Sequence, residues 1–291
     1  MPSLKAIRRR IQSVKNTQKI TKAMKAIAAA RLRKAQDAIL ALRPYSKRLA
    51  EVIAEVAART AAERELPHPL LEVREPRRVE LVVLTSDRGL CGGFNANINR
   101  RADRFFLENK DKLEDLSFAI VGRKGREYFR RRARPVKHEY MGVFSEVSVE
   151  RAREIKTALV EDYRRSELDA VYLVYNEFKS AMSQKVVVER LLPIEPLELP
   201  AEAGQIDYKY EPDRRELLNH LLPLYVEMQI YRAILESIAS ELGAKMTAMD
   251  NAMSNATEMI SLLTLQFNRA RQAAITKELM EIVGGAEALK G

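Results

Sequence analysis

The stretch LLPLYVEMQIYRAILESIASELGAKMTAMDNAMSNATEMISLLTLQF, residues 221–267, decides the fold of this chain. Apolar or small residues recur in it at mostly alternating steps of three and four, averaging about 3.5, the period of a left-handed coiled-coil seam. Only Pro223 and Gly243 interrupt this pattern, which predicts one helix over residues 213–283 that ends at Gly284 and Gly285. Its seam residues are Leu221, Tyr225, Met228, Tyr231, Leu235, Ile238, Leu242, Met246, Met249, Met253, Ala256, Ile260, Leu263, Phe267, Ala270 and Ala274. A helix of roughly 100 Å cannot bury such a stripe on its own.

The amino-terminal part of the chain supplies a partner helix. Residues 3 to about 62 repeat the same period after Ser3, a suitable N-cap, and Pro44 is expected to bend or break the helix. Its seam residues are Leu4, Ile7, Ile11, Val14, Thr17, Thr21, Met24, Ala28, Leu32, Ala35, Ile39 and Leu42. We expect the two helices to pair in antiparallel fashion, because one leads into the middle of the chain and the other leads away from it.

The carboxyl-terminal helix is the longer of the two. If both helices start level, it extends past its partner by about a dozen residues. The apolar or small residues of this extension are Ala270, Ala274, Ile275, Leu279, Ile282 and Val283. An exposed apolar surface of this kind is typical of a docking site for another protein.

Between the helices lies a segment of different character. Two proline-rich stretches, residues 64–78 and 193–212, enclose it. Apolar, β-branched runs predict strands at residues 79–85, 118–121, 169–178 and 184–192. Other runs predict helices at residues 95–110, 124–132 and 150–165. Strands that alternate with helices imply a mostly parallel sheet covered on both faces.

The expected fold class is therefore α/β. It combines a long antiparallel two-helix coiled coil, formed by the terminal helices, with an inserted three-layer α/β domain whose sheet is mostly parallel. The expected domains are the first helix at residues 1–63, the inserted domain with its linkers at 64–212, and the last helix at 213–291.

The net charge of +10 is concentrated in the first helix. Residues 1–48 hold fourteen Lys or Arg against Asp37 alone, a balance of +13 that leaves −3 for the remainder. A basic coiled coil that binds nucleic acid is one interpretation. Only Tyr45 supplies an aromatic ring there, so base stacking has no support, and a solvated coiled-coil face is the alternative.

Composition narrows the remaining classes. The single Cys91 excludes an internal disulfide, and without a secretory signal a reducing cytoplasmic compartment is expected. The Arg-rich start is also typical of organelle transit peptides, but the seam continues beyond the length of one. No apolar run reaches the 18 or more residues of a membrane span, so membrane association should be indirect. His68, His138 and His220 are scattered singly, so neither a metal site nor a cofactor is predicted.

The loop Ser86–Gly93, sequence SDRGLCGG, lies between a predicted strand and a predicted helix, where phosphate-binding loops occur. It matches neither the P-loop nor the dinucleotide glycine pattern. A tight turn is favoured, and a small nucleotide-dependent enzyme remains the alternative. Cys91 is expected to be an ordinary thiol, because no histidine is close in sequence to serve as its base.

Four stretches resemble the gamma subunit of F-type ATP synthases. They are MKAIAAARLRKAQ (24–36), TSDRGLCGGFNANI (85–98), YKYEPD (208–213) and NRARQAAITKELMEIVGGAEAL (268–289). The resemblance covers the whole chain in order. It implies the non-catalytic central shaft of a rotary, proton-translocating synthase, with no cofactor of its own.

The resemblance also implies partners and positions. The coiled coil would turn inside three alpha and three beta subunits, and the α/β domain would rest with the epsilon subunit on the c ring, at the cytoplasmic face of the cell membrane. Contacts with the beta subunit would fall on Met24, Lys245, Arg271, Gln272, Thr276 and Glu278. The apolar bearing tip would be Ile275, Leu279, Ile282 and Val283. The c-ring and epsilon side would carry Tyr208, Tyr210 and Glu211. Lys245 stands where many relatives have Arg.

Overall fold

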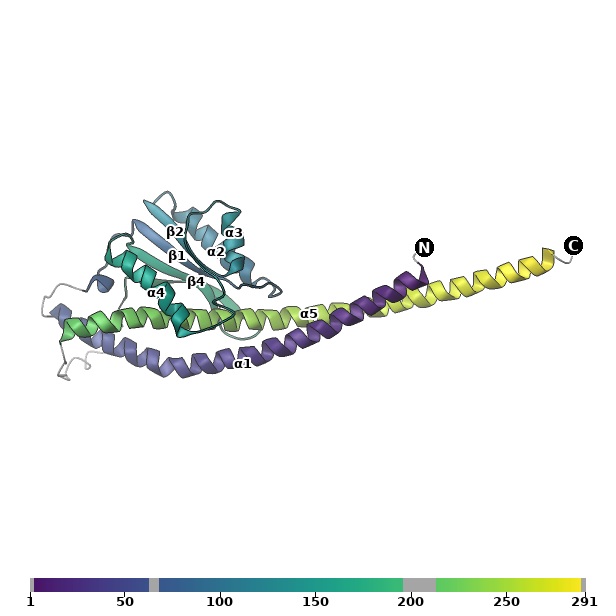
Figure 1. Ribbon diagram of the computed structural model, residues 1–291, viewed down its shortest axis with the longest axis horizontal. Coiled ribbons are helices and arrows are strands. Elements are labelled where there is room, and N and C mark those ends of the chain that lie inside the picture. The colour runs from purple at the N-terminus through teal and green to yellow at the C-terminus, as the bar shows by residue number, and fades with distance from the viewer. Residues whose placement is uncertain (1–2, 63–67, 196–212, 289–291) are drawn as a thin grey trace. The chain divides into compact units, whose positions relative to one another are not determined.

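The structure, a computed structural model, describes residues 3–62, 68–195 and 213–288 (Figure 1). The chain divides into two compact units. The helical unit combines Met1–Ala28 with Met246–Gly291, and the sheet unit is Ala29–Lys245. Both long helices contribute to both units.

Two long helices begin at side-chain caps. α1 (Leu4–Ala62, 59 residues) follows Ser3, whose hydroxyl accepts a hydrogen bond from the backbone N–H of Ala6 at 3.3 Å. α5 (Arg214–Ala288, 75 residues) follows Asp213, whose carboxylate accepts one from the N–H of Glu216 at 2.8 Å. Each cap satisfies one of the unpaired donors of a helix start. The two long helices predicted from the seam are confirmed.

Neither the proline expected to bend or break the first helix nor the glycines expected to stop the last one ends its helix. Pro44 lies inside α1, so a break at this residue, one of its two expected effects, does not occur. α5 passes through Gly284 and Gly285, so the stop expected there is wrong. A glycine inside a helix costs about 1 kcal/mol relative to alanine, which weakens the helix without terminating it.

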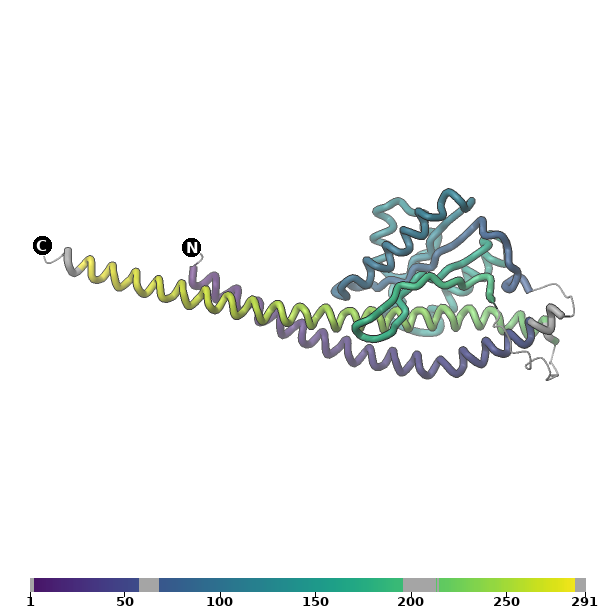
Figure 2. Tube along the Cα trace, turned by 180° about the vertical axis from the view of Figure 1, so that it is seen from behind, coloured from purple at the N-terminus to yellow at the C-terminus, as the bar shows by residue number. Residues whose placement is uncertain are grey.

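In the helical unit the two chain ends run antiparallel (Figure 2), and three side-chain contacts record their register. The contacts are Lys25 Nζ to Asp250 Oδ1 at 2.5 Å, Gln18 Nε2 to Thr257 Oγ1 at 2.8 Å, and the Arg8 guanidinium 5.6 Å from the centre of the Phe267 ring. From one pair to the next, the residue number falls on α5 by as much as it rises on α1. That relation is the one expected of antiparallel helices in a fixed register.

The sheet unit is built on five strands in the order β3-β2-β1-β4-β5. The strands are β1 (Arg78–Leu84), β2 (Asp115–Val121), β3 (Val136–Tyr140), β4 (Ala170–Phe178) and β5 (Gln184–Leu192). All neighbours pair in parallel except β4 and β5, which form an antiparallel hairpin. The mostly parallel sheet expected from the sequence is confirmed.

Helices cover both faces of this sheet (Figure 1). α2 (Phe94–Asn109) and α3 (Arg123–Arg130) pack on the face that carries Leu81 and Phe118. The other face meets α4 (Val149–Arg164) and the first part of α5, where Ser237 and Ser240 donate hydrogen bonds to backbone carbonyls of β1 and β4. Burial of these apolar layers on both sides of the sheet forms the core of the unit.

Two short elements were not predicted. β3 reads VKHEY, and its burial alternates because it is the edge strand next to β2. A charged five-residue run carries too little apolar signal to be recognised as a strand. The 3-10 helix η1 (Pro69–Leu71) lies in the first proline-rich stretch.

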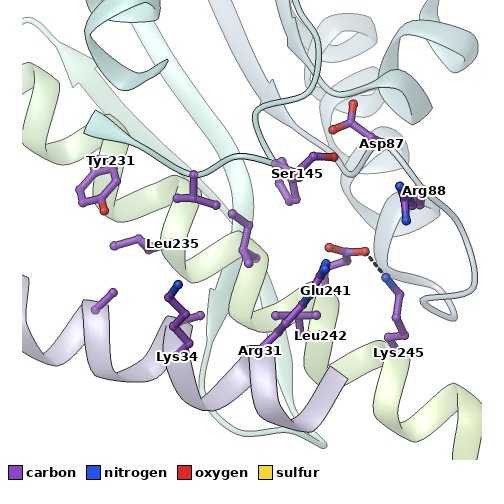
Figure 3. Close-up of a pocket in the computed structure, with 15 residues that line it drawn as sticks. Arg31, Lys34, Asp87, Arg88, Ser145, Tyr231, Leu235, Glu241, Leu242 and Lys245 are labelled. Atoms are coloured by element: carbon purple, nitrogen blue, oxygen red, sulfur yellow. Dashed lines mark hydrogen bonds and ion pairs between the residues drawn. The ribbon is translucent and has the colours of Figure 1, made fainter. Parts of the chain in front are cut away.

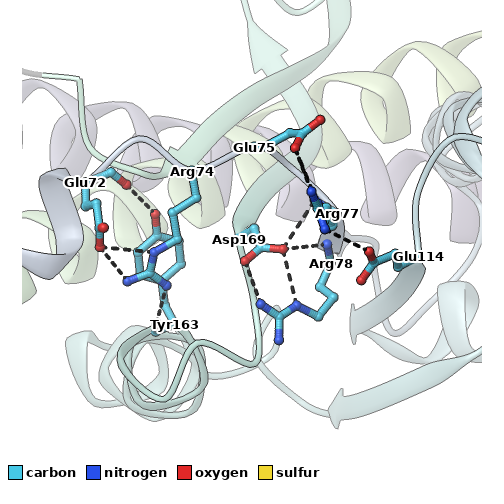
Figure 4. Close-up of polar contacts among 8 residues, drawn as sticks. All are labelled: Glu72, Arg74, Glu75, Arg77, Arg78, Glu114, Tyr163 and Asp169. Atoms are coloured by element: carbon cyan, nitrogen blue, oxygen red, sulfur yellow. Dashed lines mark hydrogen bonds and ion pairs between the residues drawn. The ribbon is translucent and has the colours of Figure 1, made fainter.

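A polar cluster holds the amino end of the central strand (Figure 4). The buried carboxylate of Asp169 accepts hydrogen bonds from the backbone N–H groups of Arg77 and Arg78 at 3.2 and 2.8 Å, and from Nη2 of Arg78 at 2.9 Å. Beside it, the Arg74 guanidinium lies 4.9 Å from the centre of the Tyr163 ring and 2.8 Å from a Glu72 carboxylate oxygen. The arginines of this stretch therefore tie the strand to the segment before β4 and to α4.

Candidate functional site

The carboxyl-terminal end of α5 exposes the apolar residues that the sequence singled out. In this α5 end segment, defined as residues 271–285, Ile275, Leu279, Ile282 and Val283 are 50%, 58%, 71% and 51% exposed. Met280, which was not predicted as part of the tip, is 67% exposed. Within the helical unit the segment extends past the start of α1 (Figure 1). The described residues of α1 therefore do not reach it as a partner helix.

Polar candidates lie on the same segment. Arg271, Gln272, Thr276 and Glu278 are all exposed. The Thr276 hydroxyl donates to the backbone carbonyl of Gln272 at 3.0 Å, so this hydroxyl is directed along its own helix. The segment thus carries both polar and apolar exposed side chains on a single helix.

The α1 part of the helical unit presents a strongly basic outer face. Within the described residues, Lys25 pairs with Asp250, whereas Lys15, Lys19 and Lys22 are exposed and form no ion pair. Met24 is half-buried in the same unit. The outer face is therefore available to negative groups of a partner.

Two large apolar residues interrupt this basic face. Ile20 and Ile27 are 60% and 56% exposed, although isoleucine is a preferred core residue. Seven residues separate them, so they occupy the same heptad position outside the seam. The predicted seam does not include them. The available signal was a bulky apolar residue repeated at a position where the coiled coil expects polar ones.

Lys245 lies in the sheet unit, in a pocket of about 520 Å³ between α1, α5 and the loops that follow β1 and β3 (Figure 3). Its Nζ is 2.7 Å from Oε1 of Glu241, and both side chains are largely buried, at 15% and 8% exposure. Arg31, Lys34 and Arg88 also line the pocket. Lys245 is thus already engaged in an ion pair.

The loop after β1 is held by its own polar groups. The first N–H groups of α3, the helix after β2, donate to this loop and to Thr85 beside it: Arg123 N to Asp87 Oδ1 at 3.2 Å, Lys124 N to the Ser86 carbonyl at 3.1 Å, and Gly125 N to Thr85 Oγ1 at 2.8 Å. Gly122, at φ 92°, packs so closely on the Thr85 carbonyl that a Cβ would lie 2.0 Å from its oxygen. These contacts are those of a tight turn packed against the connection from β2 to α3.

Cys91 is part of the same turn. Its side chain is 2% exposed, and its sulfur accepts a hydrogen bond from Nδ2 of Asn95 at 3.2 Å. Burial raises the pKa of the Cys91 thiol, which disfavours the thiolate that a nucleophile needs.

Two observations complete the placement of the predicted residues. Tyr208, Tyr210 and Glu211 lie outside the described residues. Among the described residues, no helix combines the length and apolar content required to cross a lipid bilayer.

A family model, curated relatives and solved structures were compared with this chain, and all three point to ATP synthase. A family model described as ATP synthase matches residues 3–289. The ATP synthase gamma chain of Anaeromyxobacter sp. (strain Fw109-5) is 57% identical over 290 residues, covering 100% of both chains, and that of Pelotomaculum thermopropionicum is 52% identical with the same coverage. A chain of the Tetrahymena thermophila mitochondrial ATP synthase central stalk and c ring aligns with a TM-score of 0.61 and 26% identity, covering 80% of this chain and 99% of the other.

Proposed function

This chain belongs to the ATP synthase gamma chain family, and we propose that it is the central-stalk rotor of a proton-translocating F-type ATP synthase. In this role it carries rotation of the c ring to the catalytic subunits of the F1 part. The rotor itself is not catalytic.

One observation supports the role most directly: the exposed α5 end segment. Each exposed apolar side chain forgoes roughly 1.5–3 kcal/mol of burial. Burial in a complex would therefore stabilise that complex through four side chains: Ile275, Leu279, Ile282 and Val283. An apolar sleeve formed by other subunits suits a turning helix, because apolar contacts have no directional bonds.

Coupling then follows from differential contact. A rotor changes the nucleotide affinity of a catalytic subunit only if it contacts the conformations of that subunit with different free energies. Directional contacts come from polar groups, and the basic outer face of α1 suits carboxylates of the surrounding subunits. Ile20 and Ile27 add apolar contacts on that face.

The proposed partners and contacts are as follows. Three alpha and three beta subunits surround the paired terminal helices, and the chain is peripheral at the cytoplasmic face of the cell membrane as part of the ATP synthase complex. Contact with the beta subunit involves Met24, Lys245, Arg271, Gln272, Thr276 and Glu278. The c ring and the epsilon subunit face Tyr208, Tyr210 and Glu211.

Two truncations test the role of the α5 end segment. Removal of the residues after Val283 leaves the apolar and polar groups in place, so ATPase rate and thermal dissociation of the complex with alpha and beta subunits should change little. Truncation after Ala270 removes both groups and should lower the ATPase rate and the dissociation temperature together. The variant that ends at Val283 is the matched control, because it also lacks the last residues of the chain but keeps both groups of contacts. Equal behaviour of the two truncated chains would show that the segment does not dock.

A further inference from the structure

Three potential metal ligands converge between the sheet and α4. Glu80 lies on the central strand β1, His138 on the edge strand β3, and Asp162 on α4, which covers this face. Each offers one ligand atom, and these atoms all lie within 4.8 Å of one another. The three residues are far apart in sequence, so their spacing does not predict the cluster.

Glu80 lacks a polar partner. Its side chain is 0% exposed, and neither carboxylate oxygen has a hydrogen-bond partner among the described residues. The hydroxyl of Ser117, its neighbour across the β1–β2 pairing, is likewise buried and unpaired there. Buried polar groups are almost always hydrogen-bonded or bound to a metal, because leaving one unpaired is costly. We therefore expect the Glu80 carboxylate to bind a group that is not part of the chain.

The geometry of the other two ligands suits a small ion. Nε2 of His138 and Oδ2 of Asp162 are 3.4 Å apart, which is long for a hydrogen bond. Two ligands about 2.0–2.1 Å from a tetrahedral zinc ion are separated by roughly 3.3–3.4 Å. A carboxylate oxygen of Glu80, the third ligand, lies within 4.8 Å of both atoms.

We propose that Glu80, His138 and Asp162 bind a divalent transition-metal ion, with Zn²⁺ the best match, and leave a fourth position for water. One imidazole and two carboxylates form a ligand set that suits zinc. Mg²⁺ and Ca²⁺ prefer oxygen ligands alone.

The surroundings of the cluster show what an ion would displace and how it would enter. Lys137 Nζ lies 2.8 Å from Oδ2 of Asp162, the same oxygen that lies 3.4 Å from Nε2 of His138, so a metal ion would take the place of this ammonium group at Oδ2. The side chains of His138 and Asp162 are 28% and 13% exposed, which gives the ion a path from solvent to the buried Glu80. An ion here would join the edge strand β3 to β1 and α4, so its role would be to stabilise the sheet unit.

Zinc binding by the full, tag-free chain tests the proposal. After treatment with a chelator and dialysis, the protein is titrated with Zn²⁺ while bound metal and thermal unfolding are measured. We expect one zinc per chain and a higher unfolding temperature with zinc. His138→Gln should weaken binding by at least roughly tenfold, the lower end of the losses seen even when groups outside the ligand set are removed. His220→Gln is the matched control, because His220 is exposed on α5, and should bind as the unmodified chain does.

A second pair of measurements separates metal binding from misfolding. Asp162→Asn alters a partly exposed ligand and should also lose zinc while keeping its circular dichroism. Co²⁺ added to the unmodified chain should give the intense visible absorption of a tetrahedral site, and His138→Gln should abolish it. Equal zinc binding by the unmodified chain and His138→Gln, or no zinc binding by the unmodified chain, would overturn the proposal.

Discussion

Asp169 stabilises the sheet unit through hydrogen bonds to the start of β1. Four donors from Arg77 and Arg78 reach its carboxylate. Burial alone would raise the pKa of Asp169, but the hydrogen bonds from Arg78 and from the two backbone N–H groups outweigh it, so the pKa is lowered below 3.8. A carboxyl group with a depressed folded-state pKa stabilises the fold above its unfolded-state pKa. That contribution is lost as the pH falls through the folded-state value.

Asp169→Asn should therefore destabilise the chain in a pH-dependent way. At pH 7 we expect a loss of about 2 kcal/mol in the free energy of unfolding, because charge-assisted hydrogen bonds to a buried group are lost. The loss should begin to shrink as the pH falls below about 4, where the carboxyl group of the unfolded chain is protonated, and should shrink further as the pH falls through the lower folded-state pKa. Urea denaturation at several pH values measures both effects. Asp115→Asn, at an exposed aspartate that starts β2, is the control, and an equal loss in both variants would contradict the assignment.

Single residues mark where sequence reasoning reaches its limit. The glycines and small polar residues after β1 pointed correctly to a turn, because turn chemistry is local. The contacts of Glu80 could not be predicted, since they depend on which strands become neighbours. Ile20 and Ile27 were visible in the sequence, but a search for one seam passes over apolar residues on the other side of the helix.

At the scale of elements, α5 changes its environment along its length. Between Leu218 and Gly243 it is buried on several sides, since it contacts the sheet as well as α1. In the helical unit the buried positions narrow to one stripe through Met249, Ala256 and Leu263. The seam predicted both long helices because its period is local information. It could not distinguish these two environments, because both satisfy the same period.

The register in the helical unit gives an element-scale prediction. Cysteines placed at Gln18 and Thr257 should be joined efficiently by a short bifunctional maleimide, because these side chains are hydrogen-bonded at 2.8 Å. Cysteines at Gln18 and Asp250, about two turns away, should react poorly. Gel mobility after cross-linking of the isolated chain measures both. Equal reaction of the two pairs would mean that the helices slide or pair in another register.

At the scale of the whole molecule, the two units are stabilised differently. The sheet unit has helices on both faces of a sheet and its own core. The helical unit has one seam between two helices, and most of the stability of helices in proteins comes from the packing of an apolar face. Its exposed apolar and basic residues are consistent with a part of the chain that completes its packing in a complex.

Rotation of a probe on this chain tests the rotor assignment most directly. Met182, in the β4–β5 turn, is 89% exposed, whereas the single native Cys91 is buried, so Met182→Cys provides a selective attachment site. The complex with alpha and beta subunits is immobilised through the beta subunits, and a bead on Cys at position 182 is followed while ATP is supplied. If the chain is the rotor, the bead turns repeatedly in one direction during ATP hydrolysis and stops when ATP is removed. ATP hydrolysis at the full rate with a stationary bead would contradict it.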